Sequence, residues 1–206
     1  VAGYIVGFVA PFLEKKLPEG LNLIVGALAI APLARIIAIA VDPVVNSTLL
    51  NIGRMISAAA EQSPLIMGLL LGGIMKMICT SPLSSMALTA MLGLDGLAMG
   101  IAAIACVGGS FTNGIIFDRL KLGERSNVIA VMLEPLTQAD IITQNPIPIY
   151  GSNFFGGGLA GLAAAMLGII NNAPGTASPI PGLLAPFGFN PPLKVVAAIV
   201  LAAIGG

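Results

Sequence analysis

The chain has 206 residues, of which 57% are hydrophobic and 9% are charged, and its mean hydropathy of +1.01 lies well above that of soluble domains. The nine basic and nine acidic side chains cancel, so the composition gives no basic surface for nucleic acid. Because the sequence contains no His, it excludes a catalytic His, a phosphohistidine and a His-ligated metal from these 206 residues. The composition therefore predicts an integral membrane protein.

The N-terminal part of the chain is apolar from its first residue. It begins with Val and lacks a basic leader region, so we expect an internal fragment without its N-terminal spans. Residues 1–13 are too short to cross a bilayer and predict the end of a span. Residues 21–41 are long enough to cross, although they contain Pro32 and Arg35. Residues 44–62 mix apolar and polar side chains at helical spacing, which predicts a separate amphipathic helix.

A Gly-rich and Met-rich span is predicted at residues 65–78, where Gly68, Gly72 and Gly73 allow close helix contact. Hydroxyl side chains and a proline follow it in residues 79–86. One interpretation makes Ser81 the N-cap of the next helix. The other adds that a helix beginning at membrane depth offers free N–H groups to a polar ligand.

The next apolar run, residues 86–107, is interrupted at Gly93, Asp95 and Gly96. It predicts either one kinked span or, as the acidic residue between two glycines favours, a hairpin of two short helices. The Gly, Ser and Thr residues at 108–113 then predict a turn.

Four further elements follow in chain order. Residues 117–125 predict a charged loop, and residues 156–170 a span with a small-residue packing face. Residues 171–181 predict a loop. A final span is expected within residues 183–206, where prolines delay the helix until about Leu193.

The stretch from residue 127 to residue 158 combines carboxylates, carboxamides and prolines between apolar segments. A helix from Asn127 would meet Pro135 after little more than two turns and should break there. Broken backbone at membrane depth is tolerated only where it is buried in protein or lines a wet cavity. Such a cavity would be lined by Glu134, Gln138, Asp140, Gln144 and Asn145, whereas the alternative is a solvated loop between two spans.

Two sequence runs resemble enzyme IIC, the membrane permease of the bacterial sugar phosphotransferase system. They are KMICTSPLSSMALTAML and KLGERSNVIAVMLEPLTQADIITQNPIPIYGSNFFGGGLAG, which look like its fructose-type branch. More closely still, CTSPLSSMALTAMLGLDGLAMG and EPLTQADIITQNPIPIYGSNFFGGG look like the enzyme IIC-related family that includes the perfringolysin O regulator. Fructose-type members carry Thr before and Gly after the sugar-site Glu, where this chain has Leu133 and Pro135. Their loop of Gly-Gly-Pro, then Asn and Lys, is here Thr-Ser-Pro followed by two Ser.

We therefore expect an all-α polytopic membrane protein with broken helices and re-entrant hairpins, forming a single enzyme IIC-like domain over residues 1–206. The resemblance implies a multi-pass sugar permease of the bacterial cell membrane, a homodimer, and separate IIA and IIB phosphocarrier proteins. It implies no catalytic residue in this chain, no cofactor and no metal. The expected substrate-binding residues are Glu134, Gln138, Gln144, Asn145, Thr80, Ser81 and Ser84, with Ser85 beside them.

Two other functions stay open from the sequence. The first is a membrane sensor or regulator that keeps the binding site of such a permease without transporting. The second is a carrier coupled to protons through Glu134 or Asp140, since an ionisable residue at membrane depth is costly and usually functional.

Overall fold

The computed structural model describes Leu28 and residues 31–205, so the predictions for residues 1–13 lie outside the described residues. The chain divides into two compact units, residues 1–48 and 49–206, and each is described by itself. Across the described residues all regular secondary structure is helical, as expected for an all-α protein. Two helices, Ala31–Gln62 and Gly96–Leu120, are long and apolar enough to cross a membrane.

Apart from Leu28, the described part of the first unit belongs to α3 (Ala31–Gln62), whose residues from 49 on are counted in the second unit. The prediction of a span ending at residue 41 and a separate amphipathic helix from residue 44 is wrong, because Pro43 lies inside α3. A proline removes one backbone donor, and a long apolar helix can continue through it. Beside Pro43, the Asn46 amide donates to Asp42 at 2.9 Å, so the polar side chains of this stretch bond within the helix.

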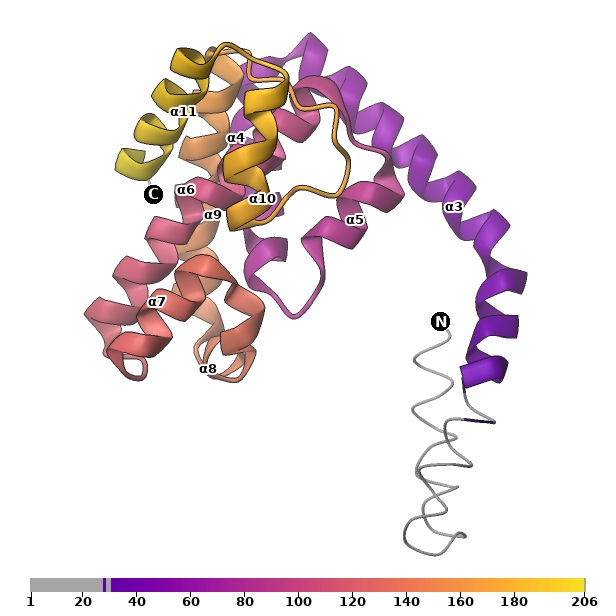
Figure 1. Ribbon diagram of the computed structural model, residues 1–206, viewed down its shortest axis with the longest axis horizontal. Helices are drawn as coiled ribbons and strands as arrows, with labels where there is room; N and C mark the ends of the chain where they lie inside the picture. The colour runs from indigo at the N-terminus through magenta and orange to yellow at the C-terminus, as the bar shows by residue number, and fades with distance from the viewer. Residues whose placement is uncertain (1–27, 29–30, 206) are drawn as a thin grey trace, which may run out of the picture. The chain divides into compact units, whose positions relative to one another are not determined.

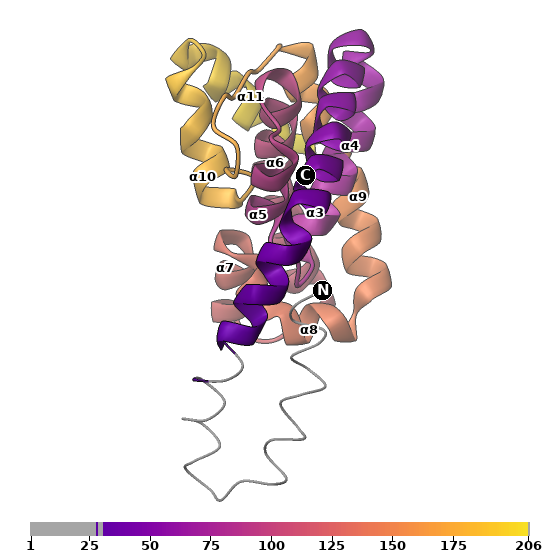
Figure 2. The same ribbon diagram turned by 90° about the vertical axis from the view of Figure 1, so that its right-hand side faces the viewer.

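The core of the second unit is built from α4 (Pro64–Thr80), α6 (Gly96–Leu120) and α9 (Pro146–Met166), which lie side by side (Figure 1). Figure 2 shows α4 and α9 running next to each other, and they make the most extensive contact of any two helices described. A Cβ at Gly72 would lie 2.5 Å from the Gly157 carbonyl oxygen. The predicted close contact through small residues is confirmed for this helix pair.

Between α4 and α6 lies the short helix α5 (Ser85–Leu92), which ends at Gly93 in the left-handed conformation. The predicted break after residue 92 is confirmed. The predicted cap is wrong, because Ser81 ends α4 and the N-cap of α5 is Ser84, whose hydroxyl accepts from the Ala87 N–H at 3.2 Å.

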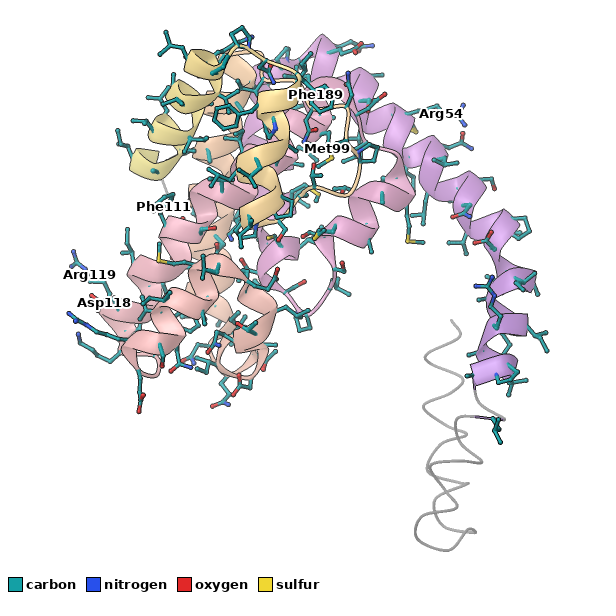
Figure 3. All side chains as sticks on the ribbon, viewed as in Figure 1. Arg54, Met99, Phe111, Asp118, Arg119 and Phe189 are labelled. Carbon is teal, nitrogen blue, oxygen red and sulfur yellow. The ribbon has the colours of Figure 1, made fainter. Side chains whose placement is uncertain are left out.

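The turn predicted at residues 108–113 is also wrong, because these residues lie within α6. Their small side chains serve close packing rather than a change of direction: Gly108 lies against Ala160 and Ala202. As Figure 3 shows, α6 runs from Met99 past Phe111 to Asp118 and Arg119, which are exposed.

After α6 the chain forms α7 (Arg125–Leu133), the 3₁₀ helix η2 (Pro135–Gln138) and α8 (Ala139–Gln144). The predicted break at Pro135 is confirmed, because α7 ends at Leu133 and Glu134 is its C-cap. Pro146 does not interrupt a helix but begins α9, where its missing N–H costs nothing. The small-residue span therefore starts ten residues earlier than predicted.

The C-terminal part consists of α10 (Pro179–Leu184), the 3₁₀ helix η3 (Ala185–Gly188) and α11 (Pro192–Gly205). The last helix starts late, as the sequence predicted, whereas the sequence did not predict a helix at α10. The Ser178-Pro179 pair is a helix-start signal that the sequence analysis assigned to a loop. Both α10 and α11 pack on α6, and α11 also packs on α9.

Candidate functional site

Four helix ends meet around a cavity of about 160 Å³ in the second unit. The end of α4, the start of α5, the junction of α7 with η2 and the start of α10 each contribute side chains to it. We call it the Glu134 cavity; its lining consists of Cys79, Leu83, Ser84, Ser85, Met86, Glu134, Leu136 and Ser178. The second half of the first polar break, residues 83–85, therefore meets the start of the second, Glu134 and Leu136.

Glu134 is placed by the proline that follows it. A residue before proline is pushed out of the helical region, and Glu134 is extended, with φ −151° and ψ 98°. The carboxylate consequently stands at the helix break rather than on a helix face. One of its oxygens accepts a long contact from the Leu136 N–H at 3.5 Å, and the other accepts from the Ser178 hydroxyl at 3.3 Å. Both contacts leave acceptor capacity for a ligand.

The opposite wall is held by the start of α5. The Ser85 hydroxyl is buried and donates to the Ala177 carbonyl, which ties α5 to the segment that carries Ser178. Ser84 caps α5 with its side chain and also lines the cavity. The buried thiol of Cys79 closes the wall from α4.

Three of the predicted site residues lie outside this lining. The Gln138 carbonyl oxygen accepts from the Asn127 amide at 2.6 Å, so this side chain ties η2 to the start of α7. The Asn145 amide donates to the Ile141 carbonyl at 3.0 Å and closes the end of α8. Gln144 is exposed.

Thr80 and Ser81 also lie outside the lining. The Ser81 hydroxyl donates to the Ile78 carbonyl at 2.7 Å and so helps to end α4. Thr80 belongs to a buried polar layer between α4, α6 and α9: the Asn113 amide donates to its hydroxyl at 3.3 Å, and the Asn153 amide donates to the Asn113 carbonyl oxygen at 2.6 Å. The sequence analysis missed this layer because it placed Asn113 in a turn.

Ser178 and Cys79 are further lining residues that the sequence did not single out as site residues. The signal for Ser178 was its position before Pro179, which marks a helix start. For Cys79 the sequence contained no comparable signal, because a cysteine at the end of an apolar span is usually a small buried hydrophobe. Within the described residues no group of three His, Cys, Asp or Glu side chains could hold a metal ion.

Comparison with known proteins adds one finding. A family model described as "Phosphotransferase system, EIIC" matches residues 1–205, nearly the whole chain. No curated protein and no solved structure matches.

Proposed function

The chain belongs to the phosphotransferase system EIIC family, and from this premise we propose that the Glu134 cavity binds the sugar that the system transports. Membership makes the chain a membrane component of a sugar permease. The observation that supports the cavity as its sugar site is the meeting of Glu134, Ser84 and Ser178 from three distant parts of the sequence.

The chemistry of the lining suits a neutral polyol. A sugar hydroxyl both donates and accepts hydrogen bonds, so it needs groups of both kinds rather than a counter-charge. Glu134 supplies charge-assisted acceptors, which form the stronger hydrogen bonds, and the two serine hydroxyls donate or accept. Leu83, Met86 and Leu136 supply apolar contact for the C–H faces of the ring.

Several features of the proposal come from the family resemblance alone. They are the fructose-type branch, the homodimer, the multi-pass placement in a bacterial cell membrane, and delivery of the phosphoryl group by separate IIA and IIB proteins. In this picture the Glu134 cavity lies at membrane depth, where helix breaks around a fixed site are typical of transporters.

The test compares Glu134→Gln with Asp140→Asn in the full chain, by isothermal titration with a panel of sugars and sugar alcohols. Gln keeps the size of the side chain but loses its charge and one acceptor. We expect it to weaken binding by about 1.5 to 3 kcal/mol, or roughly ten- to a hundred-fold. Asp140 is exposed and does not line the cavity, so Asp140→Asn is the matched control and should bind as the parent does.

Equal binding by Glu134→Gln and the parent chain would show that this cavity is not the sugar site. Uptake by proteoliposomes containing the parent chain and its phosphocarrier proteins then separates transport from sensing. Binding without uptake or phosphorylation would contradict the permease and fit the sensor instead.

A further inference from the structure

The second half of α6 forms one side of a groove that α7, α10 and α11 complete. The groove consists of two cavities, of about 330 and 170 Å³, which adjoin because they share Phe111 and Met132. We call it the α6 groove and define it by the residues that line it from α6 and α7: Val107, Phe111, Ile115, Asp118, Arg119 and Met132. None of these residues lines the Glu134 cavity.

The end of the groove near Val107 is apolar. Leu133 of α7 and both Ile180 and Leu183 of α10 line it with exposed side chains. Ser110 is the polar side chain of this lining, but it is buried and its hydroxyl donates to the carbonyl of the preceding helical turn, at 3.1 Å. This end therefore offers apolar contact and no free hydrogen-bonding group.

The other end of the groove carries two opposite charges, Asp118 and Arg119, both of them exposed. Phe111, Ile115 and Asp118 follow one another at helical spacing and so share a face of α6, and in Figure 3 both charged residues lie at the same edge of α6 as Phe111. Within the part of the chain that the structure describes, neither charged side chain has an ion-pair or hydrogen-bond partner. Both remain free to bind a ligand.

The length of the groove matches one leaflet of a membrane. From Val107 to Arg119 α6 rises by about 18 Å, at about 1.5 Å per residue. One leaflet of a hydrocarbon core of about 30 Å is about 15 Å thick. Since α6 is long and apolar enough to cross a membrane and leads into the charged loop at 117–125, a crossing α6 puts Asp118 and Arg119 at the level of the lipid headgroups.

We propose that the α6 groove binds a phospholipid with a primary-amine headgroup, a phosphatidylethanolamine. Arg119 binds the phosphate, Asp118 accepts hydrogen bonds from the ammonium, and an acyl chain lies along Ile115 and Phe111 toward Val107. This site is separate from the Glu134 cavity and goes beyond the proposed function, because it does not depend on sugar binding.

The reason for this choice of lipid is that its headgroup carries the two charges that the groove complements. A guanidinium matches the geometry of a phosphate with paired N–H donors. A carboxylate forms charge-assisted hydrogen bonds with an ammonium. Phosphatidylglycerol has the phosphate but no cation for Asp118, and the trimethylammonium group of phosphatidylcholine has no N–H to donate.

The test measures lipid binding by native mass spectrometry. The full chain is delipidated in detergent and mixed with phosphatidylethanolamine, phosphatidylglycerol or phosphatidylcholine of identical acyl chains. We expect the first lipid to bind about fivefold more tightly than the other two, since one exposed charge contact distinguishes them. Arg119→Gln should weaken its binding about fivefold, and Asp118→Asn should reduce it to that of phosphatidylglycerol.

Arg125→Gln and Asp140→Asn are the matched controls, because both residues are exposed and neither lines the groove. Neither should change the binding of any of the three lipids. Equal binding of the three lipids by the parent chain, or unchanged phosphatidylethanolamine binding by Arg119→Gln, would overturn the proposal. So would a dimer that Arg119→Gln separates into monomers, because the groove would then be an interface between two copies of the chain.

A second measurement locates the bound lipid. A phosphatidylethanolamine with a diazirine at the end of one acyl chain should, on illumination, label residues 107–111 of α6 or the neighbouring α10. Excess unlabelled phosphatidylethanolamine should suppress this labelling, whereas phosphatidylcholine should not. Labelling confined to other helices would place the lipid elsewhere and contradict the proposal even if the affinities follow the expected order.

Discussion

Asn113 is the central residue of the buried polar layer between α4, α6 and α9. It accepts from Asn153 at 2.6 Å and donates to Thr80 at 3.3 Å, and all three side chains are fully buried. Polar groups enclosed by apolar helices must bond to one another, because no water is at hand to replace a missing partner. The layer thus fixes how the three helices are rotated about their own axes.

Replacing Asn113 by Ala should therefore cost about 1 to 3 kcal/mol of stability, since it leaves the Thr80 hydroxyl and the Asn153 amide short of a partner. Denaturant unfolding in detergent measures the change. Asn46→Ala is the matched control, because Asn46 is half-buried in α3 and its side-chain amide donates to the exposed Asp42, four residues earlier in the same helix. Its effect should stay within about 0.5 kcal/mol, and equal effects of the two substitutions would contradict a structural role for the layer.

At the scale of single residues, the position of Glu134 at the helix break could be predicted from the sequence, because it depends only on the next residue, Pro135. The neighbouring amides were less predictable. Gln138 and Asn145 have the same hydrogen-bonding groups as a ligand site, yet Gln138 bonds to Asn127 and Asn145 to the Ile141 carbonyl. Which partner an amide finds depends on how the short helices fold back, and a single sequence does not encode that locally.

The helix pair α4 and α9 supplies two of the three side chains of the polar layer, Thr80 and Asn153. Its backbones approach closely at Gly72, where a Cβ would lie 2.5 Å from the Gly157 oxygen and 2.9 Å from the Gly161 Cα. Such an approach is possible only without side chains at the contact.

Gly72→Ala should consequently destabilise the protein by about 1 to 3 kcal/mol, because neither backbone can yield. Gly151→Ala provides the control in α9 itself, since nothing lies within 4 Å of its added Cβ. Helix propensity then favours Ala by up to about 1 kcal/mol. The two melting temperatures should move in opposite directions, and a stabilising Gly72→Ala would disprove the close packing.

At the scale of elements, helix breaks at prolines and glycines were predictable, as at Pro135 and Gly93. The errors arose where the same residue types serve packing. Gly108 and Gly109 resemble a turn in the sequence but lie buried in α6, because their facing partners are Ala160, Ala202 and the Lys76 stem. Pro43 resembles a helix end but lies within α3. In an apolar chain, small residues and prolines mark either a break or a contact.

At the scale of the whole molecule, hydropathy alone predicted a helical membrane protein, and the family match confirms an EIIC permease component. The second unit, residues 49–206, contains every residue of the Glu134 cavity. The cavity joins parts of the chain up to about a hundred residues apart, from Cys79 to Ser178. Their meeting follows from the packing of α4 and α10 on α6 and of α5 on α4, which no local pattern in the sequence specifies.

The most direct test of the Glu134 cavity as the sugar site uses Cys79 as a reporter, because its thiol lines the cavity. In a Cys106→Ala background Cys79 is the only cysteine of these 206 residues. A small methanethiosulfonate reagent should label it more slowly as a binding sugar is added, with half-protection at the dissociation constant found by titration. Glu134→Gln should abolish the protection at the same sugar concentration. A sugar that binds by titration while Cys79 reacts at an unchanged rate would show that it binds elsewhere.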